Sequence, residues 1–134
     1  TDADLSPFES RGGKLLIYHG WADPLVTPYN TVDYYEAVVR SVGGRAAAEA
    51  FVRLFMAPGV GHCRGGAGPD QFDMPAALER WVEQGIAPDR VTAAHVTDGN
   101  VDRTRPLCAY PQVARWTGQG SSDDATNFRC VDPD

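Results

Sequence analysis

The sequence predicts an α/β fold built on a parallel sheet. Two apolar runs, residues 14–19 and 51–57, are strand-sized and show no alternation, which is typical of parallel strands covered on both faces. Each run is followed by a loop and then by a segment with helical periodicity. The order strand, loop, helix, strand, loop, helix predicts helical crossovers between parallel strands.

The chain divides into three segments by composition. Residues 1–13 hold Pro7 and the pair Gly12-Gly13, and we expect a lead-in segment there. Residues 14–85 form the βαβα unit, whereas residues 86–134 have little periodicity and predict an irregular tail with one short strand at 92–96. A length of 134 residues with 43% hydrophobic side chains suits one domain with a packed core.

The first predicted helix covers residues 29–42. Asn30 or Thr31 is the expected cap, and Gly43-Gly44 is expected to end the helix. Apolar side chains recur at three- and four-residue spacing, at Val32, Tyr35, Val38, Val39 and Val42.

The second predicted helix starts near Asp73, which is a suitable cap, and runs to about Gln84 before Gly85. Its apolar face is formed by Ala76, Ala77, Leu78, Trp81 and Val82.

Charge and hydropathy exclude two classes of partner. Twelve basic and eighteen acidic side chains give a net charge of −6, and no basic run forms a patch, so we expect no binding to a nucleic-acid backbone. No apolar stretch approaches the roughly 18 residues that span a bilayer, so we expect no membrane-embedded segment.

The three cysteines are unevenly placed. Cys108 and Cys130 lie in the tail, 22 residues apart, and a disulfide between them would contribute about 3 kcal/mol in the chain-entropy model. Cys63 is then left over, as a free thiol or as one with a partner outside the chain. Three reduced cysteines are the alternative.

Asp23 and His62 are the candidate catalytic residues. Each follows a predicted strand, and functional side chains gather at the carboxyl ends of parallel strands. Asp23, between Trp21 and Pro24, suits an acid that orients a histidine. His62 lies in a glycine-rich loop that suits a base moving protons. The alternatives are an aspartate that organises a turn and a solvated loop histidine.

The nucleophile of such a triad is not found in this chain. In an α/β-hydrolase the triad runs serine, aspartate, histidine, with the serine in a G-x-S-x-G turn. Asp23 precedes His62 by 39 residues, in the right order, but none of the serines lies in such a turn: Ser6, Ser10, Ser41, Ser121 and Ser122. We therefore expect the chain, which starts with Thr1, to be the C-terminal part of a longer serine esterase.

Other polar residues are assigned to structure. We expect His19 to be satisfied by the backbone, and His95 to have no acidic or thiol partner. The pair Asp123-Asp124 predicts a turn or a helix cap, with weak calcium binding as its alternative. A metal site from His62 and Cys63 is disfavoured, because adjacent residues rarely supply two ligands to one ion; we expect no metal site.

Several stretches resemble the tannase and feruloyl esterase family. Residues 12–24, Gly12-Gly13-Lys14-Leu15-Leu16-Ile17-Tyr18-His19-Gly20-Trp21-Ala22-Asp23-Pro24, are similar to its acid loop. Residues 55–63, Phe55-Met56-Ala57-Pro58-Gly59-Val60-Gly61-His62-Cys63, are similar to its histidine loop, and residues 105–111 and 116–130 to its C-terminal segment. The resemblance covers residues 12 to 131.

This resemblance implies a partial α/β-hydrolase fold: the last parallel strands with crossover helices and a disulfide-stapled tail. It implies hydrolysis of aromatic esters such as gallates or ferulates, with Asp23 as triad acid and His62 as base. It also implies a disulfide between Cys63 and a cysteine that precedes the serine, and a tail disulfide between Cys108 and Cys130. The serine, the oxyanion donors and a calcium-binding lid would lie in the N-terminal part of the same protein, outside this chain. We expect no cofactor within the chain.

The implied disulfides predict an oxidising compartment, either the periplasm or the cell exterior. Two other functions stay open. One is a different α/β-hydrolase, such as a peptidase of the prolyl-oligopeptidase type. The other is a non-catalytic truncated remnant or binding module.

Overall fold

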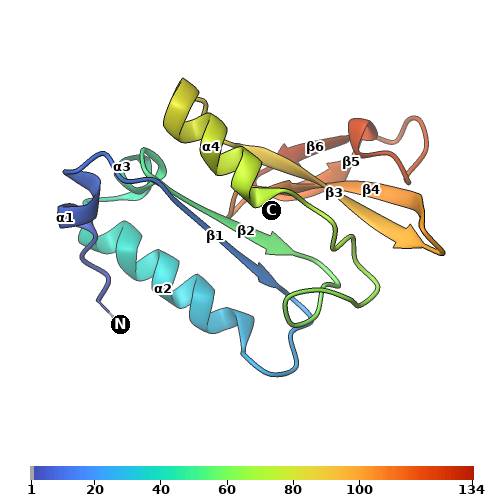
Figure 1. Ribbon diagram of the computed structural model, residues 1–134, viewed down its shortest axis with the longest axis horizontal. Coiled ribbons are helices and arrows are strands. Elements are labelled where there is room, and N and C mark those ends of the chain that lie inside the picture. Colours follow the sequence, from blue (N-terminus) through green and yellow to red (C-terminus); the bar gives the residue numbers. More distant parts are fainter. Residues whose placement is uncertain (1) are drawn as a thin grey trace.

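A computed structural model describes residues 2–134 of the chain (Figure 1). A short helix, α1 (Ser6–Glu9), lies in the lead-in segment. Two parallel strands follow, β1 (Leu15–Gly20) and β2 (Val52–Ala57), in a register that pairs Leu15 with Val52 and Gly20 with Ala57. Helices α2 (Pro28–Ser41) and α3 (Arg45–Glu49) connect them. The parallel βαβ unit predicted from the sequence is confirmed.

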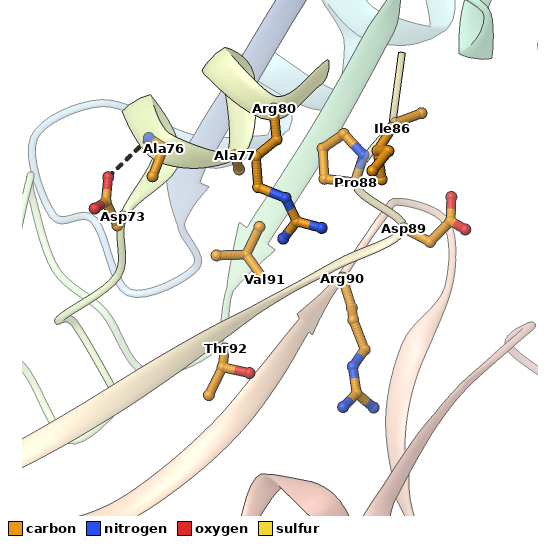
Figure 2. Close-up of a pocket in the computed structure, with 11 residues that line it drawn as sticks. Asp73, Ala76, Ala77, Arg80, Ile86, Pro88, Asp89, Arg90, Val91 and Thr92 are labelled. Atoms are coloured by element: carbon orange, nitrogen blue, oxygen red, sulfur yellow. Dashed lines mark hydrogen bonds between the residues drawn. The ribbon is translucent and has the colours of Figure 1, made fainter. Parts of the chain in front are cut away.

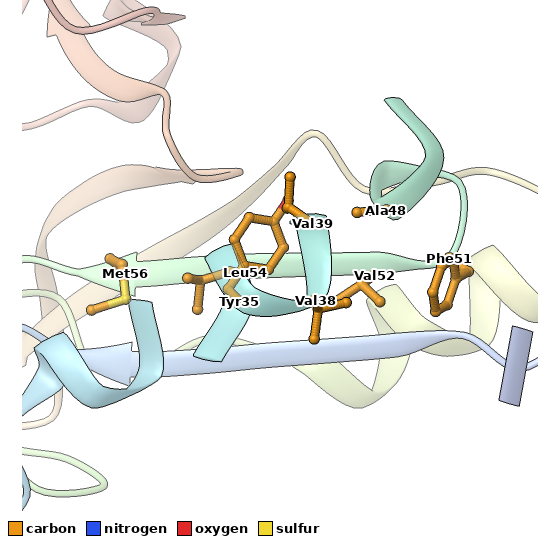
Figure 3. Packing of buried hydrophobic residues seen from close by; sticks show 8 residues of the cluster. All are labelled: Tyr35, Val38, Val39, Ala48, Phe51, Val52, Leu54 and Met56. Carbon is orange, nitrogen blue, oxygen red and sulfur yellow. The ribbon is translucent and has the colours of Figure 1, made fainter. Parts of the chain in front are cut away.

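Both faces of the parallel pair are covered. On one face, Tyr35, Val38 and Val39 of α2 pack against β2. Figure 3 shows these side chains beside the remaining members of the cluster: Ala48, Phe51, Val52, Leu54 and Met56. On the other face, Phe55 and Ala57 pack with Met74 at the start of α4 (Met74–Gln84). All six residues of β2 are buried, which explains its unbroken apolar run.

The helix ends agree with the sequence in part. Asp73 caps α4 by accepting a hydrogen bond from the Ala76 N–H at 2.9 Å, and Gly85 ends that helix with a left-handed φ of 70°. Both features were predicted. The expected cap of α2 was wrong: Thr27 occupies the N-cap position without a side-chain hydrogen bond, and the Thr31 hydroxyl binds His19.

The tail is not irregular, and that expectation is corrected. Strands β3 (Arg90–Thr97) and β4 (Asn100–Cys108) form an antiparallel hairpin, and β5 (Val113–Trp116) pairs with β6 (Phe128–Val131). A short 3₁₀ helix, η1 (Ala125–Asn127), precedes β6. The predicted short strand at 92–96 lies within β3 and is confirmed, whereas β4, β5 and β6 were missed because their side chains are largely polar or small. Val91 and Ala93 alone are buried in β3, and all of β5 is exposed.

Disulfide Cys108–Cys130 links the end of β4 to β6, as expected for the tail. The tail also covers the free edge of β2, since the Tyr110 N–H donates to the Leu54 carbonyl at 2.8 Å. Among the described strands, only β2 pairs with β1, so the other edge of β1 is open. None of the helices in residues 2–134 is long and apolar enough to cross a bilayer.

Candidate active site

Asp23 and His62 meet at the carboxyl ends of the two parallel strands. Asp23 follows β1 by three residues, and His62 follows β2 by five. The strand register brings the two loops together, and His62 Nδ1 lies 2.8 Å from Asp23 Oδ2. The structure therefore places the two predicted residues in direct hydrogen-bond contact.

Backbone contacts lock the acid loop against the histidine loop. The Trp21 N–H donates to the Ala57 carbonyl at 2.9 Å, and the Ala22 N–H donates to the Val60 carbonyl at 3.0 Å. A Cβ on Gly20 would clash with the Val60 carbonyl oxygen, so glycine is needed for this close approach. Relative placement of acid and base is thus built into main-chain geometry.

The histidine loop is braced by its own glycines. Gly59 has a left-handed φ of 71°, which L side chains rarely adopt, and its carbonyl accepts the Gly68 N–H at 3.0 Å. Gly61 donates to the Gly65 carbonyl at 2.8 Å, and the Gly65 N–H donates to Asp70 Oδ2 at 2.7 Å. The loop is therefore folded on itself, with His62 near its tip.

Asp23 is buried and fully engaged as a carboxylate. Its side chain is 3% exposed, and Oδ1 accepts the backbone N–H groups of Leu25 at 2.8 Å and Val26 at 3.0 Å. Burial alone raises the pKa of Asp23, but the hydrogen bonds from Val26, His62, Leu25 and His19 outweigh it and hold that pKa well below its ordinary value. Asp23 is therefore ionised throughout the neutral range.

His62 is accessible where Asp23 is not. Its side chain is 45% exposed and lines a cavity of about 320 Å³ with Tyr18, Phe72 and Cys63. An ionised Asp23 only accepts hydrogen bonds, so His62 donates through Nδ1–H, and in the neutral imidazole Nε2 is then the acceptor. Within the described part of the chain, Nε2 makes no hydrogen bond. This is the arrangement of a general base that faces a reactant.

His19 belongs to the site, contrary to expectation. It is not satisfied by backbone: Nε2 lies 3.0 Å from Asp23 Oδ2, and Nδ1 lies 2.6 Å from Thr31 Oγ1. The missed signal was a histidine at a strand end, four residues before the acid and facing the first turns of a packed helix.

His95 also has an acidic partner, which corrects the expectation that it had none. Its Nδ1 lies 2.7 Å from Asp102 Oδ1 across the β3–β4 hairpin, and the Thr97 hydroxyl donates to Asp102 Oδ2 at 2.7 Å. A seven-residue separation hid this pair because the hairpin itself was not predicted. Asp102 is 46% exposed, and neither residue lines the cavity beside His62.

The other candidate residues, Cys63 and Asp124, take no part in the contact between Asp23 and His62. Cys63 is exposed, has no disulfide partner within residues 2–134 and has a left-handed φ of 65°. Asp124 caps η1 by accepting the Thr126 N–H at 2.9 Å, as predicted. Within residues 2–134, no group of three or more His, Cys, Asp or Glu side chains is placed to hold a metal ion.

A larger cavity, of about 550 Å³, lies between α4 and β3 (Figure 2). Its charged side chains include Asp73, which is occupied as a helix cap, and Arg80, which extends from α4 beside Val91. No histidine, cysteine or serine lines it. It therefore offers no histidine base and no cysteine or serine nucleophile.

Comparisons with known proteins show the family of this chain. The family model described as tannase and feruloyl esterase matches residues 1–131. The chain is 46% identical to an uncharacterized esterase of Xanthomonas campestris pv. campestris, over 98% of this chain and 28% of the relative. It is also 46% identical to mono(2-hydroxyethyl) terephthalate hydrolase of Piscinibacter sakaiensis, over 99% of this chain and 22% of the relative.

Solved structures give the same result. The crystal structure of feruloyl esterase B from Aspergillus oryzae superposes with a TM-score of 0.89 at 32% identity, over 97% of this chain and 29% of the other. Tannin acyl hydrolase from Aspergillus niger gives 0.77 at 30% identity, over 96% and 24%. The chain spans about a quarter of the length of the relatives it matches. This chain belongs to the tannase and feruloyl esterase family.

Proposed function

We propose that this chain supplies the acid and base of a serine carboxylic-ester hydrolase. The observation that carries the proposal is the contact between Asp23 Oδ2 and His62 Nδ1 at 2.8 Å, in a histidine that lines the cavity and whose Nε2 makes no hydrogen bond within residues 2–134. The relatives named as esterases and hydrolases support ester cleavage as the reaction.

In the proposed mechanism, a serine from a segment outside this chain attacks the ester carbonyl. His62 Nε2 accepts the serine proton as the new C–O bond forms, and Asp23 stabilises the resulting imidazolium. His62 then returns that proton to the leaving alcohol oxygen, which releases the alcohol and leaves an acyl-enzyme. Water repeats the sequence: His62 takes its proton, the acid is released and the serine is restored.

Two features support a contribution from outside this chain. The outer edge of β1 has no partner strand among the described residues, and open edges are normally covered or paired. Large apolar side chains around the site are exposed, at Tyr18, Leu25, Val26 and Tyr29. A further strand beside β1 would cover this surface and bring a nucleophile turn to the same edge of the sheet.

The proposed substrates are esters of aromatic acids. Relatives are named for ferulate, terephthalate and tannin esters. At the cavity, Tyr18 and Phe72 pack edge to face with ring centroids 5.3 Å apart, and Tyr18 is exposed. These rings offer an aromatic acyl group a stacking surface next to His62.

Three further parts of the proposal rest on family resemblance. Cys63 pairs with a cysteine that precedes the serine and so tethers the base to the nucleophile. The calcium site lies in a lid outside this chain. The tail disulfide and the proposed Cys63 disulfide support a location in the periplasm or outside the cell.

The experiment uses the full-length protein that carries this chain. Turnover of methyl ferulate and methyl gallate is measured beside a peptide substrate for the parent protein, His62→Ala and the matched control His95→Ala. We expect ester hydrolysis that His62→Ala abolishes and His95→Ala leaves intact. Peptide cleavage alone would establish a peptidase instead, and a parent protein inactive on every substrate would contradict the proposal and favour the non-catalytic alternative.

A further inference from the structure

His19 connects helix α2 to the proposed triad acid. Its Nδ1 lies 2.6 Å from Thr31 Oγ1 on α2, and its Nε2 lies 3.0 Å from Asp23 Oδ2. Its side chain is 13% exposed, so both contacts are shielded from bulk water. On the basis of the proposed function, we infer that His19 and Thr31 are positioning residues. They hold Asp23 in place and weaken its electrostatic attraction for His62.

The donors and acceptors follow from the carboxylate. An ionised Asp23 only accepts, so His19 donates through Nε2–H, and its unprotonated Nδ1 accepts the Thr31 O–H. Every polar atom of this chain of bonds is satisfied with His19 uncharged. Thr31 lies in the first turns of α2, a helix anchored in the core by Tyr35 and Val38. Asp23 is thereby held in place by a packed helix as well as by its own loop.

The hydrogen bond from His19 also reduces the negative charge of Asp23 that is available to His62. Oδ1 is held by the backbone N–H groups of Leu25 and Val26, whereas Oδ2 accepts from both His19 and His62. A second donor on Oδ2 draws electron density from the oxygen that must stabilise the His62 imidazolium. Removal of His19 leaves that oxygen with more charge for His62 and with less restraint on its position.

These effects give two separable signatures. Less restraint lowers kcat, because a small misplacement of a catalytic group costs up to about 100-fold. More charge on Oδ2 stabilises the His62 imidazolium, so the acidic limb of the kcat/KM profile moves to higher pH. The other titratable side chain that lines this cavity is Tyr18, since Cys63 is disulfide-bonded under the proposed function, and neither residue is changed in these variants.

The test compares variants in the full-length protein with methyl ferulate. His19→Leu removes both bonds, His19→Gln retains a donor near the Nε2 position, and Thr31→Val removes the hydroxyl at constant shape, with Thr31→Ser as its control. We expect kcat to fall about 10- to 100-fold in His19→Leu and about 3- to 10-fold in Thr31→Val. KM stays within about twofold, the acidic limb moves to higher pH, and glutamine and serine recover most of the activity.

If His19→Leu does not fold, the kinetics of Thr31→Val still test the inference. Parent-like kcat and an unshifted acidic limb in Thr31→Val and in any folded His19→Leu would overturn the inference. So would a glutamine variant as impaired as leucine beside a silent Thr31→Val. His62→Ala run in parallel separates the two proposals: if it keeps full activity, the proposed function itself is wrong.

Discussion

Two histidine–aspartate pairs in this molecule have nearly the same length and opposite surroundings. The contact between His62 and Asp23 is 2.8 Å and that between His95 and Asp102 is 2.7 Å. Asp23 is 3% exposed, lies at the strand ends and accepts two backbone N–H groups, whereas Asp102 is 46% exposed on a hairpin. A short histidine–carboxylate contact is therefore not enough to identify a catalytic pair; shielding and independent anchoring of the carboxylate distinguish the two.

The largest expected effect comes from removing the base. His62→Ala is expected to lower kcat for an aromatic ester by about three to four orders of magnitude, because no other group in the cavity takes the proton from the serine. His95→Ala is expected to stay within about twofold of the parent. Steady-state kinetics of both variants measure the difference, and equal losses would remove the distinction between the pairs.

The next largest effect is expected from disrupting the close contact between the acid loop and the histidine loop. Gly20→Ala forces a Cβ against the Val60 carbonyl, whereas a Cβ on Gly61 makes only ordinary van der Waals contacts, with the carbonyl oxygens of Arg64 at 3.4 Å and Gly65 at 3.6 Å. Gly20→Ala is expected to lower the free energy of unfolding by about 2 kcal/mol and to reduce kcat. Urea denaturation and kinetics of both variants check this, and a smaller loss in Gly20→Ala than in Gly61→Ala would contradict it.

We expect the disulfide of the tail to affect the stability of the protein and to leave the geometry of the site unchanged. Replacing Cys108 and Cys130 together by serine removes a link that closes a 22-residue separation, which costs about 3 kcal/mol of unfolding free energy. At a temperature where the variant is folded, kcat is expected to be unchanged, since neither cysteine touches Asp23 or His62. Denaturation with kinetics on the same sample tests both halves, and a large fall in kcat would couple the tail to the site.

Asp23 and Asp102 are also expected to differ in how much they contribute to the pH dependence of protein stability. Both have a lowered pKa: Asp23 despite its burial, and Asp102 through hydrogen bonds from Thr97 and His95. A lowered folded-state pKa stabilises the protein above the unfolded-state value of about 3.9, and this stabilisation is lost as the pH falls through the folded-state pKa. Asp23→Asn is therefore expected to destabilise the protein at pH 7 and to matter less as the pH drops toward 2.

Urea denaturation of Asp23→Asn, Asp102→Asn and the parent across this pH range measures the effect. We expect the larger loss for Asp23, which has more hydrogen-bond donors, and an equal or larger loss for Asp102 would contradict the contrast between the pairs.

Local patterns in the sequence predicted the part of the fold where packing is strongest. The unbroken apolar run of β2 and the valines of α2 follow from burial on both faces of a parallel pair. Asp23 and His62 were found because each follows such a strand. The hairpins of the tail were missed because they are held by cross-strand bonds and a disulfide, and few of their side chains are buried.

Contacts between segments far apart in the chain account for the hydrogen-bond partners that the sequence analysis missed. His19 meets Thr31 only after α2 docks on the sheet, and His95 meets Asp102 only after the hairpin closes. Thr31 was expected as a helix cap on local grounds, yet its hydroxyl is taken by tertiary structure. Position in sequence predicts which loops hold the chemistry, whereas hydrogen-bond partners depend on how the elements pack.

The most direct test of the central assignment is kcat/KM of Asp23→Asn against Asp102→Asn in the full-length protein, with methyl ferulate as substrate. Asparagine preserves shape but cannot stabilise a histidine cation, so triad chemistry predicts a loss of about 10⁴-fold at Asp23 and a change within about twofold at Asp102. Near-parent turnover in Asp23→Asn would contradict the assignment of Asp23 and His62 as the catalytic acid and base.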